Sequence, residues 1–325
     1  MSLPQTLVIA HRGASGYLPE HTLPAYRLAL ELGAKALEPD LVPTKDGVLV
    51  IRHENEISGT TDVAEHPEFA HLKTTKNYLG FEQTGWFVED FTWDELSTLR
   101  CKERLPKLRQ SNTRFDGKYP IMQLRELLEL AQETNETSGF MPQLVFEIKH
   151  ADYFVSLGFD MARLFIEECN KADWDHSYSI IESFELTVLR RLHLEGLDAN
   201  LVFLLEAEGA PLDEIARLGA GARKYSSYLT EDALADLASW IDGVSVDKSM
   251  LFEDPDIVTR AQDAGLDVFT WTLRPENYFL QPEFRVGDDP TAFGNWEGEF
   301  RHIISTGVDA IFADHPDLAL TALGY

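Results

Sequence analysis

The chain is poor in cysteine and in basic residues, and it has no long apolar run. Cys101 and Cys169 are its two cysteines, and their distance in sequence excludes a disulfide framework or a cysteine-rich metal site. We expect two ordinary, partly buried thiols. Lys and Arg number 28 against 55 Asp and Glu, a formal net charge of −27, which argues against binding to nucleic acid or to an anionic membrane.

No apolar stretch approaches the roughly 18 residues that a membrane-spanning helix needs, so we expect no stable membrane insertion. The first residues lack the basic and apolar regions of a signal peptide. Taken as written, the chain is expected to be cytoplasmic, although a chain whose signal had been removed would look the same. With 44% hydrophobic and 26% charged residues among 325, the composition is that of a globular protein with a large core. It favours no particular oligomeric state.

Short runs rich in Val, Ile and Leu alternate with amphipathic helical patterns. Strands are expected at residues 7–11, 36–41, 48–53, 144–149, 179–183, 200–205, 243–247, 267–272 and 309–313. The second and third of these are too close in sequence for a parallel crossover and must form a β-hairpin. The other eight predict an α/β fold, a (βα)8 TIM barrel, with the functional groups at the carboxyl ends of its strands.

The hairpin and two irregular segments complete the predicted architecture. A two-residue turn at Asp46-Gly47 would pair Lys45 with Val48 and Asp40 with His53. We predict one domain over residues 1–325, with insertions at 54–119 and 274–295 over the active face. Both segments are rich in aromatic residues, which suits a cap or a substrate-shaping lid. A satellite core beneath a long loop is the alternative interpretation.

Acidic residues occur near the ends of neighbouring predicted strands. Glu38 and Asp40 lie two positions apart on one strand, which places them on the same face, and Glu147 lies near the end of the next barrel strand. Any one of them could be a solvated strand residue. Three carboxylates at corresponding strand ends instead predict a site for one hard divalent cation, Mg²⁺ or Ca²⁺, and an all-oxygen ligand set argues against zinc.

Two histidines and two cations are expected beside this acidic group. His11 ends the first strand, and the hairpin would bring His53 to the same place. An isolated histidine at a strand end is usually structural, but a pair beside a metal can deprotonate a nucleophile and protonate a leaving alcohol. Arg12 and Lys149 could hold phosphate oxygens. Together these residues predict phosphoryl-transfer chemistry.

The same residues, in this order, resemble the glycerophosphodiester phosphodiesterase family, which belongs with the phosphatidylinositol phospholipases C among metal-dependent TIM-barrel phosphodiesterases. The resemblance rests on AHRGASGYLPEHT at residues 10–22, LEPDL at 37–41, TKDG at 44–47, VIRH at 50–53 and TTD at 60–62. Later matches are EIK at 147–149, SF at 183–184, WT at 271–272 and GVDAIFAD at 307–314.

The resemblance implies a role for each residue of the site. Glu38, Asp40 and Glu147 would be metal ligands, His11 and His53 the acid/base pair, and Arg12 and Lys149 the phosphate contacts. Ser183 and Trp271 would line the substrate pocket, with core packing an equally good reading. The family usually has His-Asp at His53-Glu54, and often Asp-Arg at Ser58-Gly59; neither departure removes a proposed ligand or acid/base residue.

The expected activity is metal-dependent hydrolysis of glycerophosphodiesters, such as glycerophosphocholine or glycerophosphoethanolamine, to sn-glycerol 3-phosphate and an alcohol. Attack by the glycerol 2-hydroxyl, giving a cyclic phosphate, and direct attack by water are both open. A lysophospholipid or other phosphodiester hydrolase is one alternative, and an inactive barrel that binds phosphorylated ligands is another. The resemblance also suggests a periplasmic location if a signal has been removed.

Overall fold

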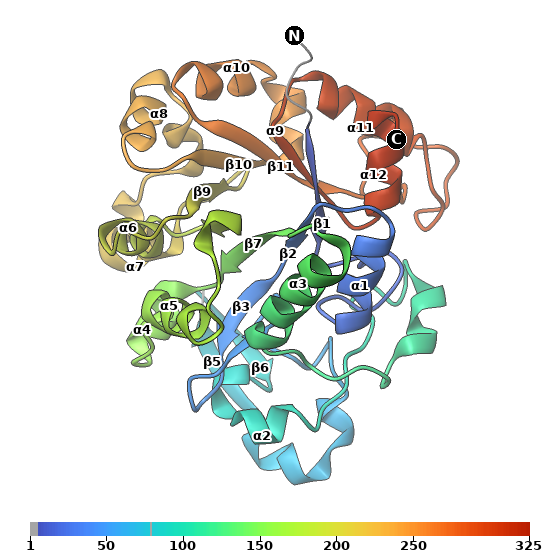
Figure 1. The fold of residues 1–325 in the computed structure, drawn as a ribbon, viewed down its shortest axis with the longest axis vertical. Coiled ribbons are helices and arrows are strands. Elements are labelled where there is room, and N and C mark those ends of the chain that lie inside the picture. Colours follow the sequence, from blue (N-terminus) through green and yellow to red (C-terminus); the bar gives the residue numbers. More distant parts are fainter. Residues whose placement is uncertain (1–5, 79) are drawn as a thin grey trace.

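The computed structural model describes residues 6–78 and 80–325. A closed ring of parallel strands lies at its centre, surrounded by helices (Figure 1). The predicted eight-stranded (βα)8 barrel is therefore confirmed. In ring order the strands are β1 (Leu7–His11), β2 (Ala36–Glu38) continued by β3 (Asp40–Pro43), β7 (Gln143–Ile148), β8 (Ser179–Ser183), β9 (Asn200–Leu205), β10 (Gly243–Asp247), β11 (Asp267–Leu273) and β12 (Ala310–Ala313), which pairs with β1.

The second barrel strand is interrupted at Pro39. The sequence predicted one strand over 36–41, whereas β2 pairs with β1 and β7, and β3 pairs with β7 and with the hairpin strand β4 (Leu49–Ile51). Proline has no N–H to give to the ladder. Its carbonyl still accepts a hydrogen bond of 2.9 Å from the N–H of Glu147, so the two halves stay in one ring.

The hairpin is present, but its predicted register is wrong by one residue. Leu41 lies opposite Ile51, and the N–H of Arg52 donates to the carbonyl of Asp40 at 2.9 Å. The connection is a three-residue loop that ends at Gly47, whose φ is 79°. A hairpin loop of this type favours glycine at that position. His53 consequently lies beyond the hairpin ladder instead of opposite Asp40.

Helices cover the outside of the barrel, and apolar side chains fill both its interior and the layer beneath the helices. Side chains such as Ile9, Val145, Val202 and Phe312 form the inner cluster. The helices are α1 (Leu23–Glu31), α2 (Trp93–Leu96), α3 (Leu124–Ser138), α4 (Ala151–Ser156), α5 (Met161–Lys171), α6 (Leu186–Leu194), α7 (Leu212–Leu218), α8 (Glu231–Ala238), α9 (Lys248–Glu253), α10 (Asp256–Asp263), α11 (Trp296–Ser305) and α12 (Pro316–Leu323).

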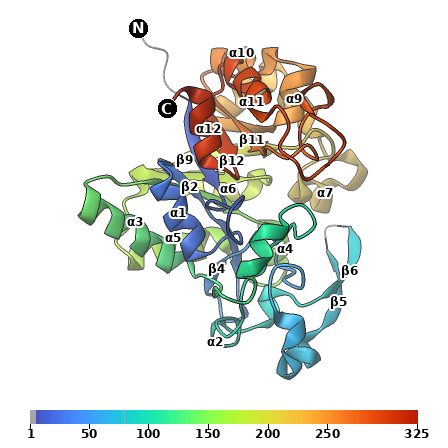
Figure 2. The same ribbon diagram turned by 90° about the vertical axis from the view of Figure 1, so that its right-hand side faces the viewer.

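The two irregular segments lie on the same side of the barrel in Figure 2. Segment 54–119 contains the two-stranded sheet of β5 (Thr74–Tyr78) and β6 (Phe81–Gly85), α2 and several 3-10 turns; segment 274–295 contains one 3-10 turn, Pro282–Phe284. Their limits as insertions in a single domain remain predictions. Both cysteines are buried and unpaired, as expected. Within the described ranges, no helix combines the length and the apolar character that crossing a membrane demands.

Candidate active site

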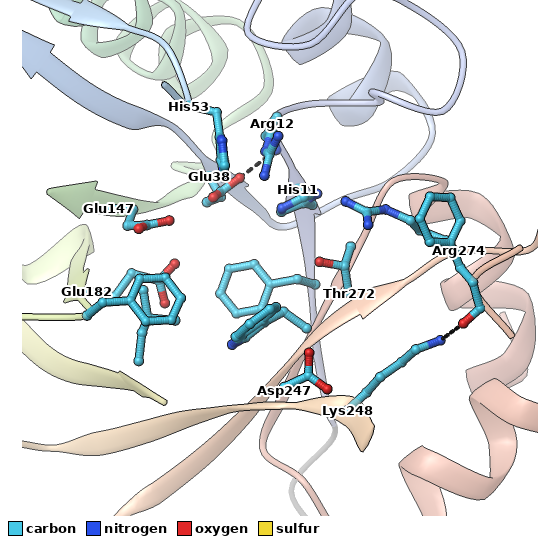
Figure 3. A pocket seen from close by; sticks show the side chains of 15 residues that line it. His11, Arg12, Glu38, His53, Glu147, Glu182, Asp247, Lys248, Thr272 and Arg274 are labelled. Atoms are coloured by element: carbon cyan, nitrogen blue, oxygen red, sulfur yellow. Dashed lines mark hydrogen bonds between the residues drawn. The ribbon is translucent and has the colours of Figure 1, made fainter. Parts of the chain in front are cut away.

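Strand register brings the acidic residues of the site together. His11 of β1 pairs with Glu38 of β2, Asp40 of β3 pairs with Glu147 of β7, and Glu147 pairs with Glu182 of β8. Paired residues on neighbouring parallel strands point the same way. Figure 3 shows His11, Glu38, His53, Glu147 and Glu182 around one cavity at the carboxyl ends of the strands.

Three carboxyl groups form the centre of this site. Ligand oxygens of Glu38, Glu147 and Glu182 lie within 4.8 Å of one another, and each residue is at most 6% exposed. Burial is the main cause of the raised pKa values of Glu38 and Glu182, and repulsion from neighbouring carboxylates raises them further. Burial raises the pKa of Glu147 to about 8 although Lys149 opposes it. Oε2 of Glu182 has no hydrogen-bond partner. This buried, oxygen-only group fits a hard divalent cation.

Asp40 lies beside this group and has different partners. Its Oδ2 is 2.7 Å from Nε2 of His21, and its Oδ1 is 3.9 Å from Nζ of Lys149. Although burial opposes ionisation, these two neighbours hold the pKa of Asp40 well below its usual range. The sequence interpretation missed Glu182 and the contact from His21. The signal for Glu182 was its place near the end of β8, in register with Glu147.

His11 is held by the last barrel strand. Its Nδ1 lies 2.5 Å from Oδ1 of Asp314, just after β12. The other oxygen of Asp314 accepts hydrogen bonds of 2.7 Å from Arg109 and Arg274. Arg109 belongs to segment 54–119, and Arg274 is the first residue of segment 274–295. Burial, and then the charge of Arg12, lowers the pKa of His11 to about 4, so the imidazole is neutral near pH 7.

His53 reaches the same cavity from the hairpin (Figure 3). Its Nδ1 is 2.9 Å from Oε1 of Glu54 and 2.7 Å from Nη2 of Arg104. Burial, together with the charges of Arg12 and Lys149, lowers the pKa of His53 well below its ordinary value. Both imidazoles therefore face the cavity in their neutral form, with Nδ1 engaged by charged neighbours.

Arg12 and Lys149 are buried cations surrounded by carboxylates. The backbone N–H of Arg12 donates to Oε2 of Glu38 at 2.6 Å, and its guanidinium donates to Glu20 at 2.9 Å. Lys149 Nζ donates to Oε1 of Glu147 at 2.7 Å. Both cations lie beside the acidic group and partly offset its charge, which would otherwise repel an anionic substrate.

Ser183 and Trp271 occupy different positions. The hydroxyl of Ser183 donates to the carbonyl of Ile148 at 2.9 Å and accepts from the N–H of Glu185 at 3.2 Å, so it ties the ends of β7 and β8 together. Trp271 lines the cavity, and its buried Nε1 has no hydrogen-bond partner. Both residues border the cavity that opens beside His53.

The site consists of three adjoining cavities. The central one, of about 280 Å³, contains the acidic group and both histidines. A cavity of about 220 Å³ adjoins it beside His11 and is lined by Arg12, Arg104, Arg109 and Arg274. One of about 550 Å³ adjoins it beside His53. A parallel barrel with ionisable groups converging at its carboxyl face has the architecture of TIM-barrel enzymes.

Comparison with known proteins identifies the family. Residues 11–318 match the glycerophosphoryl diester phosphodiesterase family. A glycerophosphodiester phosphodiesterase of Arabidopsis thaliana is 33% identical, with 94% of this chain and 82% of the relative aligned. One from Haemophilus influenzae is 26% identical, with 98% and 89% aligned. The chain therefore belongs to the glycerophosphoryl diester phosphodiesterase family, a family of enzymes.

Solved structures share the fold. A putative glycerophosphoryl diester phosphodiesterase of Silicibacter pomeroyi is 22% identical with a TM-score of 0.71, over 98% of this chain and 94% of the other. An Oleispira antarctica phosphodiesterase in complex with the product sn-glycerol-3-phosphate is 21% identical with a TM-score of 0.63, over 99% and 98%. Both likenesses support the barrel fold described above.

Proposed function

We propose that this enzyme hydrolyses glycerophosphodiesters to sn-glycerol 3-phosphate and an alcohol, using one divalent cation. The observation that carries the proposal is a single cavity in which two neutral imidazoles face a buried group of three carboxyls. Membership of the family supports the same substrate class. A product of this identity is bound to the Oleispira antarctica relative.

Glu38, Glu147 and Glu182 are the proposed cation ligands, with Asp40 beside them as a further one. Their geometry favours a cation, and two of these carboxyls have an oxygen without a hydrogen-bond partner, Oε2 of Glu182 and Oδ1 of Asp40. Carboxylate oxygens suit Mg²⁺ or Ca²⁺. Such a cation, when bound, neutralises charge that develops on the phosphate in the transition state.

The two histidines are the proposed proton carriers. A carboxylate only accepts hydrogen bonds, so Nδ1–H of neutral His11 donates to Asp314 and the lone pair is on Nε2. His11 is thereby suited to remove a proton from the attacking hydroxyl. Nη2 of Arg104 donates to Nδ1 of His53, because a guanidinium has no lone pair with which to accept. Neutral His53 therefore carries its proton on Nε2 and is suited to share it with the departing alcohol oxygen. Each transfer is typically worth 10² to 10⁴ in rate. Arg12 and Lys149 are the proposed contacts to phosphate oxygens.

The decisive experiment is release of sn-glycerol 3-phosphate from glycerophosphocholine. EDTA should abolish release, and added Ca²⁺ or Mg²⁺ should restore it. Restoration by one cation and not the other would identify the preferred metal. Absence of release with either cation would contradict the proposal and favour a lysophospholipid substrate or a binding role.

A further inference from the structure

The cavity of about 550 Å³ beside His53 differs in chemistry from its counterpart beside His11. It shares His53, Glu147, Phe184 and Trp271 with the central cavity, so the two form one continuous space. Its volume is in the range of cavities that bind small molecules. A phosphodiester held at the centre would therefore extend one of its two alcohols into this space.

Three aromatic rings form a corner in this cavity. The ring centroids of Phe184 and Trp271 are 5.7 Å apart with an interplanar angle of 86°, and those of Phe184 and Tyr225 are 6.3 Å apart at 74°. Rings that meet nearly at right angles surround the space between them with ring faces and ring edges. Aromatic faces arranged in this way attract organic cations, quaternary ammonium groups in particular.

The charged groups around the corner favour a cation as well. The cavity is lined by Lys149 and His150 on one hand and by four carboxyl groups on the other: Glu54, Glu147, Glu185 and Glu206. Lys149 is already paired with Glu147 at 2.7 Å. Burial raises the pKa of Glu185 to about 8, which leaves it uncharged at neutral pH. Glu54 already faces His53 at 2.9 Å and His150 at 3.4 Å, so Glu206 is the carboxyl group that an occupant would meet.

The phenol of Tyr225 lies near Glu206. Burial raises the pKa of Tyr225, and the charge of Glu206 raises it further, because a carboxylate opposes the formation of a phenolate. On the opposite side of the site, the smaller cavity is lined by four arginines, each of which is paired with Glu20 or Asp314. The side beside His11 is thus rich in paired charges, whereas the side beside His53 is aromatic and has Glu206 in its lining.

We propose that the aromatic cavity binds the leaving alcohol and selects cationic amino alcohols, above all those with a quaternary ammonium group such as choline. The phosphodiester would lie at Arg12 and Lys149, with the ammonium group against Phe184, Tyr225 and Trp271 and near Glu206. His53, which borders both cavities, is then next to the departing oxygen. This inference rests on the proposed hydrolase function and adds the class of alcohol.

The test compares two substrates that share the phosphodiester charge and differ in the alcohol. With the cation-loaded enzyme, we expect kcat/KM for glycerophosphocholine to exceed that for glycerophosphoglycerol by about tenfold or more. Choline should also inhibit at a concentration about tenfold lower than its uncharged isostere, 3,3-dimethylbutan-1-ol. This second comparison needs no variant.

Variants locate the selectivity in the cavity. Glu206→Gln and Tyr225→Leu should each reduce the ratio of the two kcat/KM values toward one, whereas Tyr225→Phe, which keeps the ring, should retain it. Glu208→Gln makes the same charge change at an exposed position outside the cavity lining and should leave the ratio unchanged. Because Glu206 is exposed, its variant is expected to fold even if Tyr225→Leu does not.

The outcomes separate this inference from the proposed function. Equal kcat/KM for both substrates, or equal inhibition by choline and its isostere, would overturn the cationic selectivity and leave the hydrolase intact. A wild-type preference whose ratio survives in Glu206→Gln and Tyr225→Leu would also overturn the role of this cavity. Failure to hydrolyse either substrate with Ca²⁺ or Mg²⁺ would instead contradict the hydrolase function itself.

Discussion

Replacing Glu182 by glutamine is expected to weaken cation binding without lowering the stability of the cation-free protein. Glutamine keeps the shape and one oxygen of Glu182 but removes the negative charge. The pKa of Glu182 is raised by burial and by Glu147 and Asp40, so its ionised form opposes folding as the pH rises above the ordinary glutamate range. At pH 8 the cation-free variant should therefore be at least as stable as the wild type.

The magnitude follows from the loss of one charged ligand among the four proposed. Removing groups that merely support a metal ligand weakens metal binding 10- to 100-fold, and we expect at least this effect here. At a saturating cation concentration, that is about 1.4 to 2.7 kcal/mol less stabilisation. With an unfolding entropy of about 2.1 cal/mol/K per residue and 325 residues, the cation-induced rise in Tm should shrink by about 2 to 4 °C.

Calorimetric titration with Ca²⁺ and Mg²⁺ and thermal melts with and without cation measure these quantities directly. Glu185→Gln is the matched control, because Glu185 is equally buried and close in sequence but accepts its hydrogen bond from the N–H of Asp152 at 2.7 Å. Its cation affinity should equal that of the wild type. Unchanged affinity in Glu182→Gln, or a cation-free variant that melts below the wild type at pH 8, would refute the reasoning.

Three further predictions concern the histidines and the buried carboxyls. His11→Ala and His53→Ala should each lower kcat by about 10² to 10⁴ while titrations show near-normal cation binding; full activity in either would disprove the acid/base assignment. Asp314→Asn leaves Arg109 and Arg274 without their shared carboxylate. Urea unfolding should show that this variant loses about 3 to 5 kcal/mol of the free energy of unfolding. Asp317→Asn is the control, because it leaves this cluster intact. Burial raises the pKa of Glu103 to about 7, so its stabilising contribution is present below pH 4.5 and is lost as the pH rises through 7. Between pH 4.5 and 8, the free energy of unfolding of Glu103→Gln should therefore rise relative to the wild type by up to about 3 kcal/mol; parallel pH profiles would show that Glu103 does not titrate in this range.

The barrel could be predicted from the sequence because its inner strands are short apolar runs separated by helical periods. β1, β8, β9 and β10 have the expected bounds. The errors arise where one residue changes the backbone locally. Pro39 interrupts the second strand, and the φ of 79° at Gly47 ends a three-residue loop where a two-residue turn was expected. Neither effect is visible in hydrophobic periodicity.

Most of the residues of the candidate site that stand at strand ends could be predicted from the sequence. The contacts between segments far apart in the chain could not. His11, Glu38, Glu147 and His53 were named from their positions and line one cavity. The bonds of Asp314 to His11, Arg109 and Arg274 join segments that only the closed ring brings together. Glu182 was missed because a single acid in an apolar strand carries no motif of its own, although its register with Glu147 gives it a place in the site.

The contact between His11 and Asp314 spans 303 residues of sequence and joins the first and last strands of the ring. During synthesis, the amino-terminal strand with His11 emerges long before Asp314. A nascent chain lacking its final strand would hold most of the site's side chains but not the carboxylate that fixes the His11 imidazole. Catalytic competence is thus acquired only when the last strand joins the first, and no shorter amino-terminal fragment should turn over substrate at the rate of the closed ring.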